Sequence, residues 1–537
     1  MFLGPVLLAR LAAMGTVLFV AACVASPPPF TPEMGIVRKE ATETFAFGFE
    51  QIADKYIDPI TIPRVVLDGM NGLRTIDDRL SVEQVGKNIS VFHRRELIGR
   101  FAAPTEDDFN GWGNLTYDIY TASKAISDPI KNASMERIYD VVFDGAVSKL
   151  DYPTTHYSGT RESRQIRARR DGFGGVGISY VTTDGVTRVT VVAIETPASN
   201  AGIRPNDIIT HVDGQPTIEL DPQQLSEKIR GRIGTPVTLR VDRFAASRPL
   251  EFTLVRALIV PRTVTSREQD GVLFLAISSF NQNTANSVSD RIKDAQERHG
   301  ANLKGIVLDL RGNLGGLLIQ AIRVADLFIE SGDIVNTRGR HQASVQHYEA
   351  ASIDLARGLP LVVLIDGRSA SASEVLTAAL QDQKRALVIG TTSYGKGTVQ
   401  TVIRLPNDAE MTLTWSRLVA PSGYAFHGLG IHPTICTSGR GGDSLPPFFA
   451  STEADEERNS RAIFEWRRVA VNDTAGREAL RKSCPAERRD DELERTLALR
   501  LIADRGAYRR LLDYTALAAT QLLPGGNLRQ MAQDPAR

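Results

Sequence analysis

The sequence predicts an α+β chain of several domains, because three kinds of local pattern succeed one another along it. Short continuous apolar runs such as KGIVLDL and PLVVLI are typical of buried parallel strands. Residues 171–256 contain short strands interrupted by glycine and asparagine turns, and both ends of the chain carry helix-like patterns. With 537 residues and 42% hydrophobic content, the chain is long enough to form several cores.

These patterns divide the chain into five parts. The formal net charge is zero, so composition gives no electrostatic bias toward nucleic acid, and we expect no nucleic-acid partner. The expected parts are a leader at 1–22, a helical N-terminal region at 23–150, a β-rich domain at 160–257, an α/β layered core at 258–437 with contributions from 117–159, and a helical C-terminal extension at 438–537.

A serine-rich turn lies between a predicted strand and a predicted helix of the core. The strand is LPLVVLID, and EVLTAALQD has apolar residues at helical spacing, so Ser369, Ser371 and Ser373 fall on the connecting turn. The first N–H groups of a helix lack intrahelical partners and can stabilise negative charge, which makes Ala372 N–H a candidate donor. A serine at a helix start is also a common N-cap, and we assign Ser369 and Ser373 to capping or turn formation.

A lysine is the candidate base for this turn, because no histidine lies between His347 and His427. Lys396 stands in the glycine-flanked turn YGKG after the strand-like RALVIG. Burial lowers the pKa of a lysine and can leave a neutral amine that accepts a proton from a serine. Gln400, four residues later, can orient that amine by hydrogen bonding, although it can also be an ordinary polar strand residue.

The segments SASASE, LQD, RALVIG and YGKGTVQ together resemble the signature of the C-terminal processing peptidases, the tail-specific family of serine-lysine proteases. The resemblance covers roughly residues 117–435. It implies that Ser371 is the nucleophile, that Lys396 is the general base and that Gln400 positions the lysine.

The same resemblance places the oxyanion donors on Ala372 N–H and on a glycine of the motif RGNLGG. That motif follows the strand GIVLDL, and its glycines let backbone approach a ligand closely. Gly315 and Gly316 both remain candidates. The family usually has proline or glycine where this chain has Leu314.

Residues 171–256 resemble a PDZ domain. In such domains a glycine-rich loop offers backbone N–H groups to the terminal carboxylate of a peptide, which adds a strand to the sheet edge. The resemblance implies an apolar C-terminus as ligand. A purely structural turn is the alternative reading of this loop, which comprises Gly175, Val176, Gly177 and Ile178.

One family element is altered just before the PDZ-like region. The heptapeptide from Asp151 to Tyr157, DYPTTHY, stands where the family prefers D-P-H-S-x-Y. We expect His156 in this segment to be structural.

Two glycine motifs resemble nucleotide-binding loops but lack the residues that such loops need. GTTSYGKGT approaches the phosphate-loop pattern, but Gly397 stands where a hydroxyl should bind magnesium. GFGGVG is followed by β-branched residues and a turn rather than by a helix. We therefore expect no organic cofactor and no metal.

The N-terminus resembles a bacterial lipoprotein signal. Arg10 precedes an apolar run that is too short to count as a spanning helix and that ends in VAAC. We expect acylation of Cys23 after cleavage, with a plain secretory signal as the alternative. Val24 is not the aspartate associated with inner-membrane retention, so the expected location is the bacterial periplasm with an anchor in the outer membrane.

Two cysteines remain after Cys23, and an even pair in an oxidising periplasm predicts a disulfide between Cys436 and Cys484. This bond would tie the end of the core to the C-terminal extension. The extension itself has no counterpart in the family's catalytic unit. It is either a docking or oligomerisation element or a cap on the core.

The sequence thus predicts a periplasmic serine endopeptidase that recognises protein tails through a PDZ domain and cleaves through an acyl-enzyme. The expected partners are proteins or peptides with exposed apolar C-termini, and an adaptor partner or a homo-oligomer is left open. The alternative function is a catalytically inactive PDZ adaptor that binds protein C-termini. A further alternative is a dyad that is misaligned until a partner binds.

Overall fold

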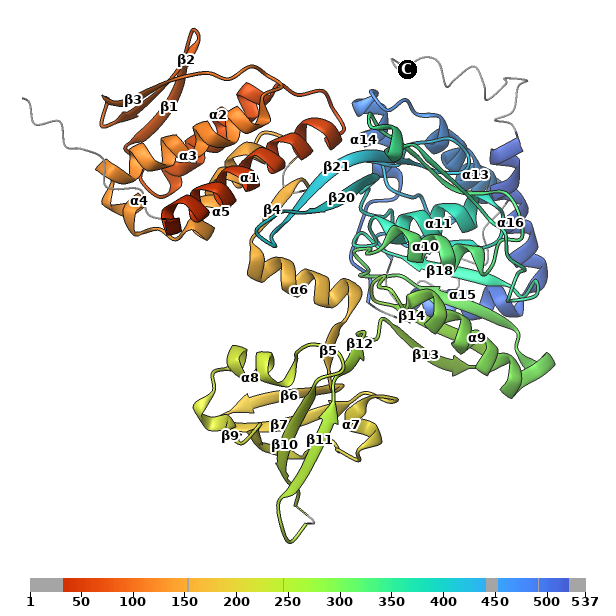
Figure 1. The fold of residues 1–537 in the computed structure, drawn as a ribbon. Helices are drawn as coiled ribbons and strands as arrows, with labels where there is room; N and C mark the ends of the chain where they lie inside the picture. The colour runs from red at the N-terminus through yellow and green to blue at the C-terminus, as the bar shows by residue number, and fades with distance from the viewer. Residues whose placement is uncertain (1–31, 152–153, 245, 441–452, 491, 521–537) are drawn as a thin grey trace, which may run out of the picture.

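The computed structural model describes residues 32–151, 154–244, 246–440, 453–490 and 492–520. The predicted leader and Cys23 lie outside these ranges. Figure 1 shows an N-terminal region and a core joined along strands β4, β20 and β21, and a smaller β-rich domain below them at the end of helix α6. Among the described helices, none has the length and apolar character needed to cross a bilayer.

The N-terminal region is built mainly from helices packed around an aromatic core. Phe45, Phe49 and Phe143 are fully buried, with Phe143 stacked on Tyr157 of strand β4 at 5.1 Å between ring centroids. Met411 of strand β21 completes this core, so the N-terminal region is continuous with the second sheet described below. Its helices are α1 (Pro32–Lys55), α2 (Ile62–Asn71), η1 (Gly72–Thr75), α3 (Phe109–Ile126), α4 (Asp128–Asn132) and α5 (Met135–Val147).

A three-stranded antiparallel sheet also belongs to this region, which was predicted from its sequence to be helical. Its strands are β1 (Leu80–Val85), β2 (Asn88–His93) and β3 (Glu96–Ala102). Val82 and Val91 face each other across β1 and β2 and are buried against the helices, while polar residues alternate with them. The alternation of apolar and polar residues that marks a strand is present in the sequence, but in each strand it extends over too few residues to predict the sheet.

The β-rich domain begins after helix α6 (Thr160–Asp171) and has its own core around Val189, Leu239 and Val241. Its sheet has the order β11-β10-β8-β7-β6, with β9 paired to β8, so β6 is an edge strand. A separate pairing of β5 with β12 closes the base of the domain. The elements are β5 (Phe173–Gly175), β6 (Ile178–Thr183), β7 (Val186–Val192), α7 (Pro197–Asn200), β8 (Ile208–Val212), β9 (Gln215–Pro216), η2 (Thr217–Glu219), α8 (Pro222–Ile229), β10 (Pro236–Asp242), β11 (Leu250–Val255) and β12 (Ala257–Ile259).

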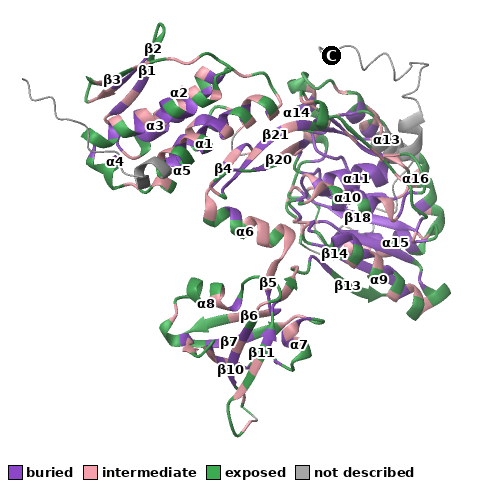
Figure 2. Ribbon diagram, in the orientation of Figure 1, coloured by how far each residue is buried: buried purple, intermediate pink, exposed green. Residues whose placement is uncertain are grey.

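The core contains a six-stranded sheet of order β13-β14-β15-β18-β19-β22, in which β14 to β22 run parallel. Figure 2 shows this sheet as the most continuously buried part of the molecule. Helices α9, α10 and α11 cover one face. The elements are β13 (Val264–Gln269), β14 (Val272–Ile277), α9 (Thr284–His299), η3 (Gly300–Asn302), β15 (Gly305–Asp309), α10 (Leu318–Asp326), β18 (Leu361–Ile365), α11 (Ala372–Asp382), β19 (Leu387–Gly390) and β22 (Ile435–Cys436).

A second sheet of order β17-β16-β21-β20 lies beside the first and receives β4 at β21. Its long hairpin brings residues after Lys396 back across the core toward the N-terminal region (Figure 1). The elements are β4 (His156–Ser158), β16 (Asp333–Arg338), η4 (Gln342–Ser344), β17 (Gln346–Glu349), β20 (Thr398–Arg404) and β21 (Glu410–Val419).

Helices α15 and α16 of the C-terminal extension cover the opposite face of the six-stranded sheet, while α13 packs through buried Trp466 against the hydrophobic cluster on the side of α9 to α11. Leu497 and Leu501 of α15 pack on alternate residues of β18 and β19, among them Val362 and Ile389. The extension is therefore a structural layer of the core, which is the capping role left open by the sequence. Its helices are α13 (Glu453–Arg468), α14 (Thr474–Ser483), α15 (Leu493–Ala503) and α16 (Arg505–Thr520).

Candidate active site

Ser371 lies at the sharp turn that leads from strand β18 into helix α11. It is the N-cap of α11, and its backbone has φ 58° and ψ −116°. A positive φ in a residue other than glycine costs about 1–3 kcal/mol and persists only where the surroundings enforce it. Such a strand-to-helix turn presents the serine hydroxyl above the end of the sheet.

Hydrogen bonds of neighbouring residues enforce this turn. The Asp366 carboxylate accepts from the backbone N–H groups of Gly312 (2.9 Å) and Ser369 (3.0 Å). The buried Ser369 hydroxyl donates to Leu310 O at 2.9 Å, and the buried Ser373 hydroxyl donates to the backbone of the RGNLGG turn at 3.0 Å. These two serines therefore join the nucleophile turn to the glycine turn, and Ser371 is the serine whose side chain remains at the cavity.

Glu374 connects the turn of Ser371 with the turn of Lys396. It is fully buried, and its Oε2 accepts from the backbone N–H of Ser371 (2.7 Å) and of Lys396 (2.8 Å). Its Oε1 accepts from Gly395 N–H and from the Ser393 hydroxyl at 2.7 Å and 2.5 Å. Burial raises the pKa of Glu374, and these four donors oppose that rise. From the sequence, Glu374 could be recognised only as an acidic residue in the first turn of a helix. Its contacts with residues about twenty positions later leave no pattern in the sequence.

Lys396 is partly buried beside the nucleophile turn. Burial is the main cause that lowers the pKa of its ammonium, and the charges of Asp151 and Glu374 oppose this change. A lowered pKa increases the fraction of neutral amine, which is the form that can accept a proton.

Gln400 lines the same cavity as Ser371 but makes other hydrogen bonds than those expected. Its Nε2 donates to Thr398 Oγ1 at 2.9 Å and, at the long distance of 3.5 Å, to Thr414 Oγ1. The structure thus brings Gln400 to the cavity, with its amide directed to threonines of β20 and β21 instead of to the Lys396 amine.

The two glycines considered as oxyanion donors differ in their hydrogen bonds. Gly315 N–H donates to Asn313 Oδ1 at 2.8 Å within the glycine turn. Within the described ranges, neither Gly316 N–H nor Ala372 N–H has an acceptor. Gly316 also lines the cavity of Ser371, and its φ of 142° is a conformation that favours glycine. This difference favours Gly316 over Gly315 as the second donor.

The cavity beside Ser371 has a volume of about 480 Å³. Its walls come from the glycine turn, from strands β20 and β21, and from helix α6, which precedes the β-rich domain. Most of the wall is apolar, which suits an extended peptide with an uncharged side chain near the reacting bond. The apolar lining residues are Ile166, Phe280, Leu317, Leu318, Val399, Val402 and Leu418.

Comparison with known proteins agrees with this geometry. Residues 271–437 match peptidase family S41, and residues 188–243 match a PDZ domain. A carboxy-terminal-processing protease of Bartonella bacilliformis is 39% identical over 305 residues, which are 56% of this chain and 69% of that protein. The chain belongs to the S41 family of carboxy-terminal-processing proteases.

This S41 peptidase is thus a serine-type peptidase with a PDZ domain. A probable CtpA-like serine protease of Staphylococcus haemolyticus is 32% identical over 357 residues, 66% of this chain and 70% of that protein. The photosystem II D1 C-terminal processing protease has 23% identity and a TM-score of 0.38 over 74% of this chain and 92% of that chain, a similarity too low to add to the argument.

The PDZ loop of this S41 peptidase lies at the start of edge strand β6. Val176 is buried, and its carbonyl accepts from Ala198 N–H at 2.9 Å, while Gly177 O accepts from Ala193 N–H at 2.8 Å. Gly177 has φ 86°, and a Cβ there would clash with Thr196. The sequence-predicted loop residues, Gly175 to Ile178, therefore lie together beside an unpaired sheet edge.

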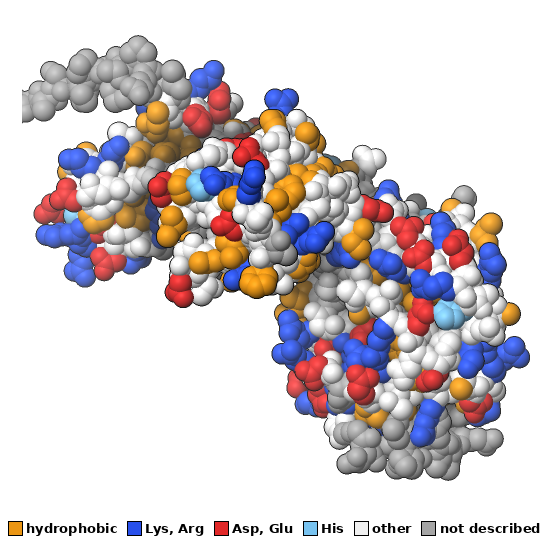
Figure 3. All heavy atoms as spheres, turned by 90° about the horizontal axis from the view of Figure 1, so that it is seen from below, with side chains coloured by type: hydrophobic (Ala, Val, Ile, Leu, Met, Phe, Trp, Pro, Cys, Tyr) orange, Lys and Arg blue, Asp and Glu red, His pale blue; other side chains and the backbone are white. Residues whose placement is uncertain are grey.

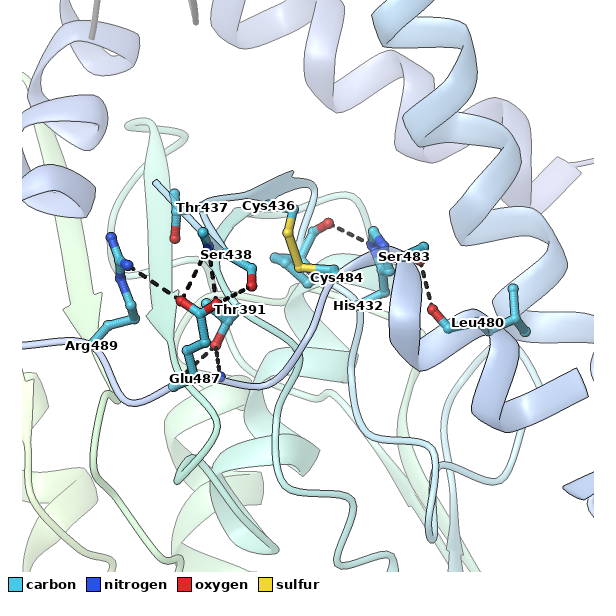
Figure 4. Close-up of a disulfide and its surroundings, with 12 residues drawn as sticks. Thr391, His432, Cys436, Thr437, Ser438, Leu480, Ser483, Cys484, Glu487 and Arg489 are labelled. Carbon is cyan, nitrogen blue, oxygen red and sulfur yellow. Dashed lines mark hydrogen bonds and ion pairs between the residues drawn. A yellow bond between two sulfur atoms is a disulfide. The ribbon is translucent and has the colours of Figure 1, made fainter. Parts of the chain in front are cut away.

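The C-terminal extension of the S41 peptidase contacts the turn of Ser371 and the strand that precedes Lys396. The structure joins Cys436 and Cys484 in a disulfide with 6.0 Å between the Cα atoms. Just beyond it, Glu487 O accepts from Gly367 N–H (2.7 Å) in the nucleophile turn and from the Thr391 hydroxyl (3.0 Å). Figure 4 shows Glu487 and Thr391 beside the disulfide.

A buried ion-pair network extends this support to the glycine turn. Arg311, which begins that turn, pairs with Asp309 at 2.7 Å and with fully buried Glu494 of α15 at 3.2 Å. Glu494 also accepts from Arg489 and from the Thr437 hydroxyl. Sequence reasoning missed this network, because its key pair, Arg311 with Glu494, is 183 residues apart and has no local pattern.

Among the described residues, one group of three has metal-ligand spacing. Asp333, His347 and Glu349 lie within 4.8 Å of one another on the β16–β17 hairpin. They line no part of the cavity of Ser371. The hairpin is exposed, and we assign no function to this group.

Proposed function

We propose that the chain cleaves peptide bonds through a dyad of Ser371 and Lys396. The observation that carries the proposal is the turn geometry of Ser371, which lines an apolar cavity and whose backbone N–H shares the Glu374 carboxylate with that of Lys396. The neutral Lys396 amine takes the Ser371 proton as the hydroxyl oxygen attacks the scissile carbonyl. The resulting ammonium then gives that proton to the leaving amine.

Two backbone N–H groups stabilise the oxyanion in this proposal. Ala372 N–H stands at the positive end of the α11 dipole, and Gly316, whose N–H has no acceptor among the described residues, lines the cavity of Ser371. Gln400 then supports the cavity wall through Thr398 and Thr414.

The PDZ domain captures the substrate in this proposal. An apolar C-terminal tail adds as a strand at the free edge of β6, and the loop of Gly175, Val176, Gly177 and Ile178 binds its carboxylate. Helix α6 leads directly from the catalytic cavity to this domain, so a chain held by its tail is kept near Ser371. Binding and cleavage thus occur at separate sites.

We place the enzyme in the bacterial periplasm, anchored in the outer membrane through acylated Cys23. The sequence of the leader supports this location, and the disulfide between Cys436 and Cys484 suits an oxidising compartment. Figure 3 shows positive and negative side chains interspersed over the visible face of the molecule, which suits protein substrates better than nucleic acid. Globomycin-sensitive processing and incorporation of labelled palmitate at Cys23, both absent from Cys23→Ala, would test the anchor.

The cleavage test uses a soluble form that begins after Cys23 and an unstructured protein with an apolar C-terminus. The unmodified enzyme should degrade this substrate, and Ser371→Ala and Lys396→Ala should bind it without cutting. The matched control substrate carries two aspartates at its C-terminus and should be cut more slowly through a higher KM. Equal cutting by all three proteins would overturn the dyad, whereas tail binding without cutting by the unmodified protein would favour the adaptor function.

A further inference from the structure

The turn that carries Lys396, residues 393–397, lies against residues 425–431, a loop that follows strand β21. Ser393 N–H donates to Ile431 O at 3.2 Å, and Ile431 N–H donates to the Ser393 hydroxyl oxygen at 2.7 Å. Gly428 N–H donates to Gly395 O at 2.8 Å. The position of this loop therefore helps to determine where the lysine turn lies.

Helix α14 of the C-terminal extension directs two arginines to these segments. Arg477 and Arg481 are four residues apart and share one face of the helix. Arg481 Nη1 donates to Leu429 O at 2.5 Å and to Ser393 O at 3.3 Å, so one nitrogen bridges the loop and the lysine turn. Arg477 instead donates to Ala425 O of the loop at 3.2 Å. Of the two arginines, Arg481 is the one that reaches the lysine turn.

The loop and the lysine turn approach each other closely at this bridge. A Cβ at Gly430 would lie 2.7 Å from Ser393 O and 3.0 Å from Arg481 Nη1, which is too close for ordinary contact. Gly430 O also accepts a hydrogen bond of 3.0 Å from Nε1 of buried Trp466 in α13. The loop is thus packed on the lysine turn and held by two helices of the extension.

Ser393 connects the bridge to the active site. Its hydroxyl donates to Glu374 Oε1, and Oε2 of the same carboxylate accepts from the backbone N–H groups of Ser371 and Lys396. Glu374 is also the negative charge that opposes the effect of burial on the pKa of Arg481. A cation on this side stabilises the buried carboxylate without requiring a protonated Lys396.

We propose that Arg481 is a positioning residue for Lys396. By joining Ser393 to Leu429, it holds the lysine turn so that Ser393 and Glu374 keep the amine within reach of Ser371. Its positive charge also keeps Glu374 ionised while Lys396 is neutral. This inference rests on the proposed dyad, and it gives the C-terminal extension a part in catalysis.

The test compares kcat and KM of Arg481→Ala with those of the unmodified enzyme on the unstructured substrate with an apolar C-terminus. Displacement of Lys396 should lower kcat about 10- to 100-fold. KM should stay unchanged, because Arg481 lines no part of the cavity of Ser371. A contact that only stabilises the fold would lower the melting temperature and leave kcat unchanged.

Chemical rescue gives a second measurement on the same variant. Arg481 is half-buried, so its truncation leaves a space that is open to solvent. Millimolar guanidinium chloride should restore kcat of Arg481→Ala at least about fivefold, because the ion can donate to the same carbonyls, and sodium chloride should not. Arg481→Lys keeps the charge and a donor, and it should retain at least about a tenth of kcat.

The matched control is Arg477→Ala, one turn earlier on the same helix face. It should lower the melting temperature as well, because it removes buried hydrogen bonds to the loop. Its kcat should stay within about threefold of the unmodified enzyme, with no response to guanidinium.

A pair of glycine variants decides the case if Arg481→Ala does not fold. Gly428 and Gly430 have φ values of 70° and 82°, so alanine strains the backbone at both positions. A Cβ at Gly428 meets open space, whereas one at Gly430 would push the loop away from Ser393 and Arg481. Gly430→Ala should therefore lower kcat at least about fivefold more than Gly428→Ala.

The positioning role would be overturned by a kcat of Arg481→Ala within about threefold of the unmodified enzyme, or by an equal fall in Arg477→Ala. A variant that guanidinium does not restore, or equal kcat values in the two glycine variants, would also contradict it. Activity that survives both Ser371→Ala and Lys396→Ala would instead overturn the dyad itself, so the two failures can be told apart.

Discussion

The two faces of the six-stranded core sheet are covered by helices with different tasks. On one face, the chain enters α10 and α11 through the glycine turn and through the turn of Ser371. On the other face, α15 lies against the same strands with residues such as Leu501, and no residue of α15 lines the cavity of Ser371. The proposed chemistry thus lies at the helix N-termini of one layer. The C-terminal extension on the other side supports the sheet and holds the turns through Glu487 and Glu494.

The largest effect that would sharpen this comparison is loss of the Ser371 hydroxyl. Ser371→Ala should lower kcat/KM by about 10⁴-fold with an unchanged melting temperature, because the hydroxyl is needed only for the reaction. Ser369→Ala is the matched control within the same turn. It removes two buried hydrogen bonds and should lower the free energy of unfolding by about 1–3 kcal/mol, with kcat reduced less than tenfold. If Ser369→Ala lost as much activity as Ser371→Ala, the two serines could not be assigned separate roles in structure and in catalysis.

Matched leucines on the two faces should separate stability from activity. Leu376 of α11 and Leu501 of α15 are both buried. Truncation of either to alanine should lower the free energy of unfolding by about 2–5 kcal/mol. Leu376→Ala should also lower kcat, because it shifts the helix that positions Ser371, whereas Leu501→Ala should leave kcat of the folded protein within about threefold. Denaturant titration and steady-state kinetics on each variant measure the two effects. A larger fall in kcat for Leu501→Ala than for Leu376→Ala would contradict the comparison.

Removal of the disulfide should weaken the supporting layer. The bond joins cysteines 48 residues apart, and the double change Cys436→Ser with Cys484→Ser should cost about 2–4 kcal/mol. Because Glu487 lies just beyond Cys484, the fall in kcat should be modest and should be reversed at lower temperature. Thermal melts with and without a dithiol reductant measure the effect. If the reductant does not lower the melting temperature of the unmodified protein, the disulfide does not stabilise the fold.

The last prediction concerns pH. Burial lowers the pKa of Lys396 below the usual value of about 10.4, and only the neutral amine can take the Ser371 proton. Below that lowered pKa, kcat/KM should therefore rise about tenfold per pH unit and then level off. If this rise of kcat/KM with pH is absent in His427→Gln, the general base is the histidine and not Lys396.

The sequence predicted the turns of Ser371 and Lys396 but not the contacts that hold them. Strand, turn and helix patterns are local, so the sequence could single out Ser371, Ala372 and Lys396 as candidates. The structure places Ser371 on the expected strand-to-helix turn. Gln400 was predicted to orient the Lys396 amine, whereas in the structure its amide donates to Thr398 and Thr414, a geometry that depends on the pairing of β20 with β21 and has no local sequence signal.

The rest of the support depends on distant pairing. Glu374 had a sequence role as a helix-start residue, yet its bonds to the lysine turn require the folded core. The packing of the extension on the back of the sheet could not be predicted either. An amphipathic pattern indicates that a helix packs with one face, but it does not identify the surface that covers that face. The three strands β1 to β3 were missed, since each is short and lies within a region of strong helical pattern.

Covalent labelling with a β-lactone acylating agent is the decisive test of the proposed Ser371–Lys396 dyad. We expect a single covalent adduct, located by peptide mass spectrometry on Ser371, that is absent in Ser371→Ala and forms far more slowly in Lys396→Ala. An adduct on another residue, or one that forms on Ser371 at the same rate without Lys396, would contradict it.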